Sequence, residues 1–475
     1  MPNLTYGMDI TLSPLRLELI SQQFDMVKTV QTMKGGKNME AQLRKRIKWL
    51  GMSIFAVILS MLFAGPALSI DEEMIKRMEK IIQQQQVQIE VQSKAIEELQ
   101  KQVQELSDIQ KQQAVTAASA GQAATAPPAV VSSSGDKVSV KLYGQVNRAF
   151  LYSDDGNSSD YYFVDNDNSS SKIGLLGAVK VNDDATVGTK MEFEYQQNPS
   201  NMVNQNDKNN VGGDSFDDRH IDVYVKSQKF GKLSIGKGDT ASNSTSEVDL
   251  SGTSVVGYSS VSDMAGGILF YNNNTDSLSD TDVGDVLSNF DGLSRDDRIR
   301  YDSPAFSGFM ASASATSGDG GDLALRYNAK FNNFKFAAAA AWANPNNEGS
   351  LKDVDNQYSG SASVLHSSGL NLTLAGGQRD YDLSGRDDPT FYYAKLGFRK
   401  HFFSLGESRF SIDYATNDDV AQNKDEAESF GFQFVQDFSK WGTECYLGYR
   451  NYDLDRSGTD FNDIDAVMSG VRVKF

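Results

Sequence analysis

Apolar and polar residues alternate with a period of two in segments of about ten residues from Lys137 onward. In TVGTKMEFEYQ, residues 186–196, the large apolar side chains share one face and the charged side chains share the other. The segments LALRYNAKF at 323–331 and SFGFQFVQDF at 429–438 alternate in the same way. Because successive side chains of a β-strand point to opposite faces, this pattern predicts strands with one apolar and one polar face.

The alternation predicts sixteen strands, which are 138–152, 171–181, 186–197, 217–227, 231–239, 297–303, 307–317, 321–331, 334–344, 356–366, 369–381, 390–402, 407–417, 427–438, 441–453 and 464–475. Tight turns are predicted at 181–184, 228–231 and 332–333, and long polar loops at 153–170, 198–216 and 345–355. A soluble sandwich also alternates, but regular alternation of short and long connections favours a transmembrane barrel. An even strand number places both ends of the barrel on one rim, predicted to be periplasmic, and sixteen strands leave a water-filled lumen.

The chain ends on a strict alternation, SGVRVKF. Val471, Val473 and Phe475 fall on one face of this segment, and Arg472 and Lys474 fall on the other. The first three are therefore predicted to face lipid on the closing strand, with Phe475 at the interface where aromatic girdles lie.

The first 69 residues are predicted to be an upstream extension and a signal peptide that is removed. Residues 50–65, LGMSIFAVILSMLFAG, are too short for a helical membrane span and follow the basic stretch RKRIKW. Small residues come next, so we expect cleavage after Ala67 or Ser69. Met33 or Met39 would be a more ordinary start of such a signal.

A coiled coil is predicted over residues 70–113, followed by an Ala/Ser/Pro-rich linker over 114–136. The seam residues recur at steps of three and four over about five heptads and are Ile75, Met78, Ile82, Gln85, Ile89, Gln92, Ile96, Leu99, Val103 and Leu106. The mixed seam leaves the number of helices open, and an unpaired Gln-rich helix is the alternative. We expect this α-helical segment to lie in the periplasm.

The composition excludes several classes of function. Lys and Arg number 45 against 63 Asp and Glu, a formal net charge of -18, which argues against nucleic acid as a partner. A single cysteine, Cys445, permits no disulfide framework, and three histidines with one thiol give no metal-ligand cluster. No cofactor and no metal are therefore expected.

Several segments of residues 137–475 together resemble the trimeric general porins of Gram-negative outer membranes. They are KLYGQVN at 141–147, SKIGLLGAVKVNDDATVGTKMEFEYQ at 171–196, FGKLSIGKGDTAS at 230–242, RIRYDSPAFSGF at 298–309 and the terminal Phe475. The resemblance implies an all-β barrel of sixteen antiparallel strands, a homotrimer and an inward-folded third loop. It also implies that Phe475 is read by the outer-membrane assembly machinery, and that lipids and lipopolysaccharide surround the barrel.

The resemblance implies a constriction with acidic residues on the third loop, about 240–296, and basic residues on the facing wall. It assigns the acidic role to Glu247 and Asp249. The implied wall residues are Lys172, Arg219, Arg298 and Arg300, and the parity of the strands adds Arg326, Lys395 and Arg399 as lumen candidates. Arg219 shares the parity of Ile221 and other lipid-side residues, so its role requires a bulge in the strand.

The predicted function is passive diffusion of small hydrophilic solutes and ions through an outer-membrane channel, with no bond made or broken. A substrate-selective channel, for example for organic acids, is an alternative because such channels resemble this chain in their coiled-coil stalk. A second alternative is a tether from the outer membrane to the cell wall, although residues 70–135 contain no visible wall-binding motif. An outer-membrane enzyme is disfavoured, because no histidine has a recognisable catalytic partner motif.

Overall fold

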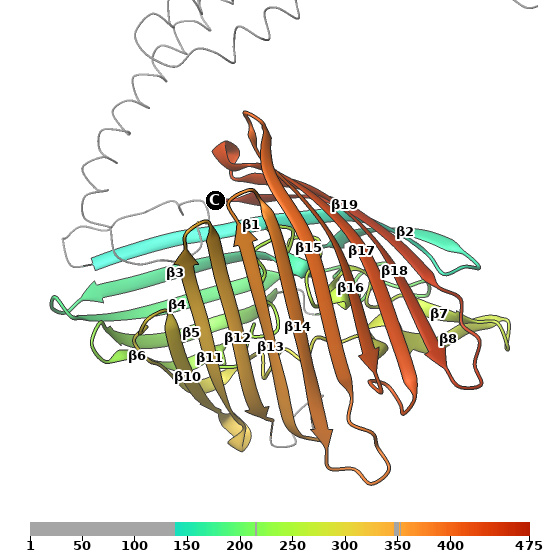
Figure 1. Ribbon diagram of the computed structural model, residues 1–475, viewed down its shortest axis with the longest axis horizontal. Coiled ribbons are helices and arrows are strands. Elements are labelled where there is room, and N and C mark those ends of the chain that lie inside the picture. The colour runs from blue at the N-terminus through green and yellow to red at the C-terminus, as the bar shows by residue number, and fades with distance from the viewer. Residues whose placement is uncertain (1–137, 214–215, 346–350, 352) are drawn as a thin grey trace, which may run out of the picture. The chain divides into compact units, whose positions relative to one another are not determined.

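The computed structural model describes residues 138–213, 216–345, 351 and 353–475 (Figure 1). These residues belong to the second of the two units into which the chain divides, Gln122–Phe475. The predicted signal peptide, coiled coil and linker lie outside the described residues. No helix in the described part is long and apolar enough to cross a membrane.

The described residues form a closed antiparallel β-barrel (Figure 1). Its strands are β1 (Val138–Asp154), β2 (Ser159–Asp165), β3 (Ser171–Lys180), β4 (Ala185–Tyr195), β5 (Phe216–Ser227), β6 (Gly231–Asp239), β9 (Arg295–Asp302), β10 (Phe309–Thr316), β11 (Gly321–Phe331), β12 (Phe334–Asn344), β13 (Val354–His366), β14 (Leu370–Tyr381), β15 (Thr390–Phe403), β16 (Gly406–Asp418), β17 (Asp425–Phe438), β18 (Thr443–Arg456) and β19 (Ile464–Lys474). Pairing of β1 with β19 closes the sheet. β2 and β3 pair one after the other with the same edge of β1, so together they count as one strand of the barrel. The seventeen segments therefore make a sixteen-stranded barrel, which confirms the predicted strand number.

The prediction of a long loop at 153–170 is wrong. β2 pairs with the C-terminal half of β1, and β3 pairs with its N-terminal half on the same side. The break between β2 and β3 contains the 3-10 helix η1 (Asp167–Ser169). The sequence of β2, SDYYFVD, does not alternate in polarity because both of its faces are apolar. Tyr162 and Val164 are buried inside the barrel, and Tyr161 and Phe163 are exposed outside it.

The barrel closes at the last residue of the chain. The backbone of Phe475 exchanges two hydrogen bonds with Gly144 on β1, with N···O distances of 2.9 and 3.0 Å. A Cβ atom at Gly144 would lie 2.7 Å from the Phe475 ring, so only glycine fits beneath this ring. Val471, Val473 and Phe475 all have exposed side chains, as predicted for the outer face. We call the rim that carries Val138 and Phe475 the terminal rim, and the opposite one the loop rim.

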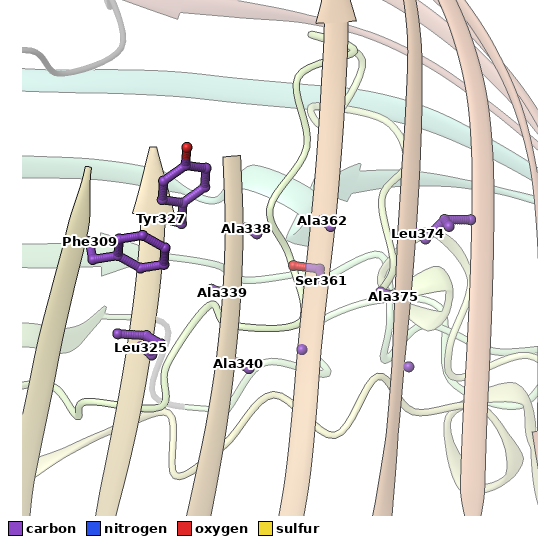
Figure 2. Close-up of a pocket in the computed structure, with 12 residues that line it drawn as sticks. Phe309, Leu325, Tyr327, Ala338, Ala339, Ala340, Ser361, Ala362, Leu374 and Ala375 are labelled. Atoms are coloured by element: carbon purple, nitrogen blue, oxygen red, sulfur yellow. The ribbon is translucent and has the colours of Figure 1, made fainter. Parts of the chain in front are cut away.

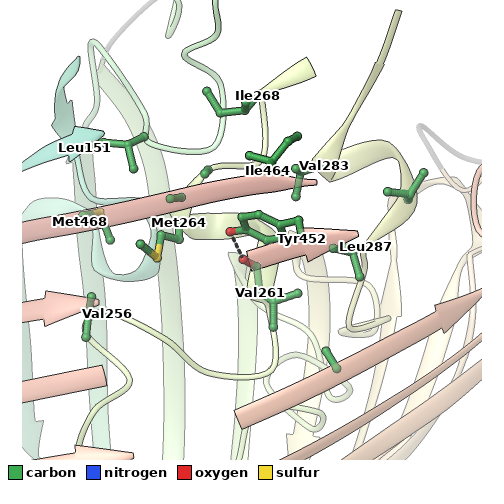
Figure 3. Packing of buried hydrophobic residues seen from close by; sticks show 14 of the residues in the cluster. Leu151, Val256, Val261, Met264, Ile268, Val283, Leu287, Tyr452, Ile464 and Met468 are labelled. Atoms are coloured by element: carbon green, nitrogen blue, oxygen red, sulfur yellow. Dashed lines mark hydrogen bonds between the residues drawn. The ribbon is translucent and has the colours of Figure 1, made fainter. Parts of the chain in front are cut away.

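Residues 240–294, here called L3, connect β6 to β9 and fold into the barrel. L3 contains the 3-10 helix η2 (Val261–Met264), a hairpin of β7 (Leu269–Asn272) and β8 (Ser277–Asp282), and the one-turn helix α4 (Val283–Val286). Its apolar residues pack against the inner wall of β15–β19, β1 and β2 in one buried cluster (Figure 3). At the centre of this cluster, the hydroxyl of Tyr452 donates a hydrogen bond to the carbonyl of Val261 over 2.9 Å (Figure 3).

The buried cluster reduces the part of the barrel interior that can be open to solvent. Inward-facing residues of these strands, such as Leu151, Ile464 and Met468, are fully buried and apolar. Because L3 covers this part of the inner wall, it is a packed core and not a surface of the channel. The open part of the lumen therefore lies on the other side of L3.

Candidate channel constriction

A polar cavity of about 570 Å³ lies between L3 and the inner wall of β3, β4 and β5. Charged side chains line the cavity from L3 and from the wall. The acidic lining residues are Asp167, Glu194, Glu247, Asp263 and Asp291, and the basic ones are Lys172, Arg219 and Arg295. The cavity therefore brings together three of the predicted site residues, Glu247 on L3 with Lys172 and Arg219 on the wall.

Arg219 reaches the cavity because β5 is bulged at this position. The register of β4 and β5 pairs Glu192 with His220 and then Phe193 with Asp218, so Arg219 has no cross-strand partner. This extra residue turns the Arg219 side chain inward, against the parity of the rest of the strand. Its guanidinium donates hydrogen bonds to Glu192 over 2.9 Å and to Glu194 over 2.6 Å.

The other two cations of the cavity differ in their pairing. Arg295 forms an ion pair with Asp239 at 2.9 Å. Lys172 lies at the start of β3, opposite Glu194 of β4, and its ammonium group makes no hydrogen bond or ion pair with the residues that the structure describes. The ammonium group of Lys172 is therefore the cation most available to a passing anion.

The acidic side of the cavity is formed by three L3 carboxyl groups held by short polar contacts. Glu247 accepts a hydrogen bond from Asn289 over 3.1 Å, and Asp291 accepts one from the hydroxyl of Ser246 over 2.9 Å. Asp263 accepts a hydrogen bond from the hydroxyl of Tyr258. These contacts fix the carboxyl groups on the side of the cavity opposite the wall cations.

Burial and mutual repulsion shift the protonation of these carboxyl groups. Burial, with the nearby Asp291 and Asp263, raises the pKa of Glu247 to about 8. Burial, with the nearby Asp167, raises the pKa of Asp263 to about 7. Burial also raises the pKa of Asp291. The acidic side of the cavity therefore gains negative charge as the pH rises through neutrality.

Comparison with known proteins identifies the family. A model of the Gram-negative porin family matches residues 114–457, which is more than half of the chain. The chain belongs to the Gram-negative porin family. This membership makes it an outer-membrane channel rather than an enzyme. A search of curated proteins finds no match.

Solved structures similar to this porin share little sequence with it. OmpT of Vibrio cholerae with its loop L8 deleted is 15% identical, with a TM-score of 0.48, over 72% of this chain and 100% of that chain. An anion-selective porin from Comamonas acidovorans is 16% identical, with a TM-score of 0.48, over 71% of this chain and 100% of that chain. OmpF of Salmonella typhi, in a complex with daunomycin, is 13% identical, with a TM-score of 0.47, over 72% of this chain and 98% of that chain.

In this porin Asp249 does not lie with Glu247 in the cavity. Its carboxylate pairs with the ammonium group of Lys395 on β15 at 2.8 Å, and the two side chains are 4% and 0% exposed. Lys395 also donates hydrogen bonds to the hydroxyl of Thr253 and the carbonyl of Gly257, both in L3. Burial raises the pKa of Asp249, but Lys395 and Ser251 lower it more, so the carboxyl stays ionised. Asp249 and Lys395 anchor L3 to the wall.

The remaining predicted basic residues bind backbone or neighbouring acids. Arg298 is buried and donates to Asp222 over 2.7 Å, and Arg300 donates to the carbonyl of Thr240 over 2.6 Å. Arg326 donates to the carbonyls of Ala241 and Asn243, both at 2.8 Å. Arg399 donates to Glu407 and to the carbonyl of Leu250. These arginines hold L3 or its flanking strands, and none of them lines the cavity.

Sequence reasoning missed Arg295, Asp263 and Asp291. Arg295 falls in the predicted third loop, just before the predicted strand 297–303, whereas β9 begins at this residue. Asp263 and Asp291 lie far along L3, where no alternation or motif predicts the path of the chain.

Proposed function

We propose that this porin lets small hydrophilic solutes and ions diffuse passively across the outer membrane. In this proposal the cavity between L3 and the wall of β3–β5 is the constriction of the channel. The observation that carries it is the arrangement of charge, with Glu247, Asp263 and Asp291 of L3 on one side and the three cations on the other. Asp167 and Glu194 lie among the cations on the wall side.

The mechanism follows from the polar lining. Hydroxyl, amide and charged groups can replace part of the water around a passing solute, so the free-energy cost of entering the cavity is small. Above about pH 7 to 8, where Asp263 and Glu247 ionise, the opposed charges produce a field across the cavity that orients dipolar solutes and biases the choice of ions. The dimensions of the cavity set the size limit.

A substrate-selective channel for organic acids is the second candidate. It is supported by the three cations of the cavity, of which Lys172 makes no ion pair in the described part of the chain. A carboxylate solute could pair with this ammonium group while its hydroxyl groups bind to the acidic side.

The proposal extends to the assembly and to residues outside the described part. We propose a homotrimer with the terminal rim in the periplasm, surrounded by outer-membrane lipids and lipopolysaccharide and inserted through recognition of Phe475. Residues 1–69 are removed, residues 70–113 form a periplasmic coiled coil, and residues 114–136 link it to the barrel. Contact of the coiled coil with the cell wall would be a secondary role.

Liposome swelling with the purified protein tests the function. Passive diffusion gives swelling rates that fall smoothly with solute size and that rise linearly with concentration for sugars, amino acids and organic acids alike. Rates that saturate for organic acids and are negligible for sugars of equal size would favour the selective channel. Correctly folded barrels that admit neither class of solute would contradict both proposals.

A further inference from the structure

Two pairs of lysines face each other across neighbouring strands at the terminal rim. Lys226 of β5 is directly opposite Lys232 of β6, and Lys330 of β11 is directly opposite Lys335 of β12. Each pair flanks the tight turn that joins its two strands. We call them the lysine pairs. Because like charges directly opposite each other in a sheet are destabilising, each pair costs the barrel some stability.

The four lysines point into the lumen. Val225 and Leu233, next to the first pair, are exposed on the outer face of β5 and β6. Figure 2 shows Leu325 and Tyr327 of β11 in a shallow hollow of the outer face that no charged residue lines, and Phe334 is exposed on the outer face of β12. Because successive side chains of a strand point to opposite faces, the lysines lie on the inner face, away from lipid.

No carboxylate neutralises the lysine pairs in the described part of the chain. Their ammonium groups make no hydrogen bond or ion pair there. Lys232 lies over the ring of Tyr224, with its ammonium nitrogen 4.8 Å from the ring centroid, and the other three lysines are exposed. Asp302, directly opposite Lys232 on β9, is bound by Arg300 at 2.8 Å instead. The ammonium groups are therefore available to a solute.

Two other like-charged pairs of the terminal rim are neutralised. Arg399 of β15 is directly opposite Arg409 of β16, and both bind Glu407, at 2.5 and 2.9 Å. Asp437 of β17 is directly opposite Glu444 of β18, and both bind Arg409, at 2.8 and 3.1 Å. An opposite charge bridges both of these pairs, whereas the lysine pairs have no bridging residue among those that the structure describes.

A solute anion can supply the missing bridge. The Cβ atoms of directly opposite residues are about 5 Å apart, and the four-carbon stems of lysine are flexible, so two ammonium groups can lie on either side of one small ion. Each ammonium group has three N–H donors and no acceptor, which suits an ion with several oxygens. Two positive charges favour an ion with two negative charges over an ion with one.

We propose that each lysine pair binds a small divalent oxyanion at the end of the lumen that opens at the terminal rim. The proposal rests on the proposed function, because the ion reaches the pairs through an open channel mouth, and it adds an anion site outside the constriction. A lipid headgroup is not the ligand, because the lysines point away from the outer face. Binding at a wet channel mouth is weak, which lets the ion leave again toward the constriction.

The loops of the opposite rim have the opposite charge. Between β14 and β19 these loops carry two cations, Arg386 and Lys424, and six aspartates, which are Asp382, Asp387, Asp388, Asp419, Asp460 and Asp463. Negative charge at the loop rim repels divalent anions, and the lysine pairs attract them at the terminal rim. We therefore expect a divalent anion to act more strongly from the terminal-rim side.

A variant without the lysine pairs tests the proposal. The four-lysine variant is Lys226→Gln/Lys232→Gln/Lys330→Gln/Lys335→Gln. The matched control removes the same charge from exposed lysines outside the lumen and is Lys229→Gln/Lys400→Gln/Lys424→Gln/Lys440→Gln. Single channels of the full-length porin are recorded in a planar bilayer in 0.1 M KCl at pH 6, at which Glu247 is neutral because burial and its acidic neighbours raise its pKa to about 8. Potassium sulfate is added to one side and then to the other, and the sulfate concentration that halves the current is measured from each side.

The expected size of the effect follows from the two charges of each pair. Two ammonium groups about 6 Å from a divalent anion raise its local concentration about tenfold at this salt concentration. The half-blocking concentration of the wild type therefore differs about tenfold between the two sides, and the four-lysine variant loses this difference while the control variant keeps it. Equal concentrations from both sides of the wild type, or an undiminished difference in the four-lysine variant, would overturn the proposal. Channels that still conduct leave the proposed function intact, whereas the absence of any current contradicts both.

Two further measurements keep the result interpretable. The four-lysine variant unfolds at a urea concentration equal to or above that of the wild type, because two like-charged contacts are removed. A lower concentration would contradict the unpaired state of the lysines. Nitrate in place of sulfate gives a smaller difference between the two sides of the wild type, because nitrate has one charge. An equal difference with both ions would contradict binding by two ammonium groups.

Discussion

Replacing Glu247 by Gln removes one titratable charge from the cavity and leaves its shape almost unchanged. Because the pKa of Glu247 is raised to about 8 by burial and by the neighbouring Asp291 and Asp263, the group is neutral below that pH and negative above it. The wild-type porin therefore becomes more cation-selective as the pH rises through about 7 to 8, where first Asp263 and then Glu247 ionise. Glu247→Gln loses the upper part of this change.

The size of the effect follows from the Coulomb energy. A cation that passes about 5 Å from the Glu247 carboxylate gains about 0.8 kcal/mol in the dielectric of water. Screening at 0.1 M salt reduces this energy to about 0.5 kcal/mol. Because an anion loses as much as a cation gains, the ratio of cation to anion permeability differs between wild type and Glu247→Gln by about fivefold at pH 9.5. At pH 6 the two proteins have the same ratio.

The reversal potential in a planar bilayer with a KCl gradient measures this ratio at each pH. Glu426→Gln, the same change on the outward face near the loop rim, serves as the control and leaves the pH dependence unaltered. The cations of the cavity that keep their charge over this pH range and set the baseline are Arg219 and Arg295. Lys172 also lines the cavity, and its charge changes equally in wild type and Glu247→Gln. Equal reversal potentials of wild type and Glu247→Gln at both pH 6 and pH 9.5 would refute the reasoning, since the charge would then not face the permeating ions.

Three further predictions follow from the contacts of this porin. Lys395→Met leaves the Asp249 carboxylate buried without its partner. The free energy of unfolding in urea, monitored by heat-dependent gel mobility, therefore falls by about 3–5 kcal/mol. The double variant Lys395→Met/Asp249→Leu recovers most of this loss. Stability equal to wild type in Lys395→Met would show that L3 is not anchored there. Arg219→Gln lowers the permeability of anions about two- to fivefold in the same bilayer assay, because a cation is removed from the cavity wall, and an unchanged reversal potential would contradict this. Gly144→Val drives a side chain into the ring of Phe475 and slows folding into lipid vesicles, whereas folding at the wild-type rate would show that barrel closure tolerates the contact.

The fold could be predicted well from the sequence wherever one face of a strand meets lipid and the other meets water. Strands such as β6, β11 and β12 have the predicted bounds. β2 was missed because Tyr162 and Val164 face the apolar cluster under L3, so its sequence lacks the polar face on which the prediction depends. A period-two pattern detects a strand by the contrast between its two environments, and here both environments are apolar.

The site could be predicted only in part. Glu247, Lys172 and Arg219 line one cavity, as expected from the resemblance. Asp249 is only two residues from Glu247 but pairs with Lys395, because the path of L3 carries it to a different wall. Strand parity predicts on which face of a strand a side chain lies, but it fails at the Arg219 bulge. It cannot be applied to L3, a loop of fifty-five residues, 240–294. The positions of Asp263 and Asp291 depend on the packing of L3, which no local pattern encodes.

In the proposed function the cavity between L3 and the wall carries the ionic current. Ser254 lines this cavity, and Ser279 lies in the β7–β8 hairpin and does not line it. In a Cys445→Ser background, each is changed to cysteine and treated with a charged methanethiosulfonate reagent during single-channel recording. We expect a stepwise fall in conductance for Ser254→Cys and none for Ser279→Cys. Full conductance after complete modification of Ser254→Cys would contradict the proposed path of the ions, because they would then cross the barrel by another route.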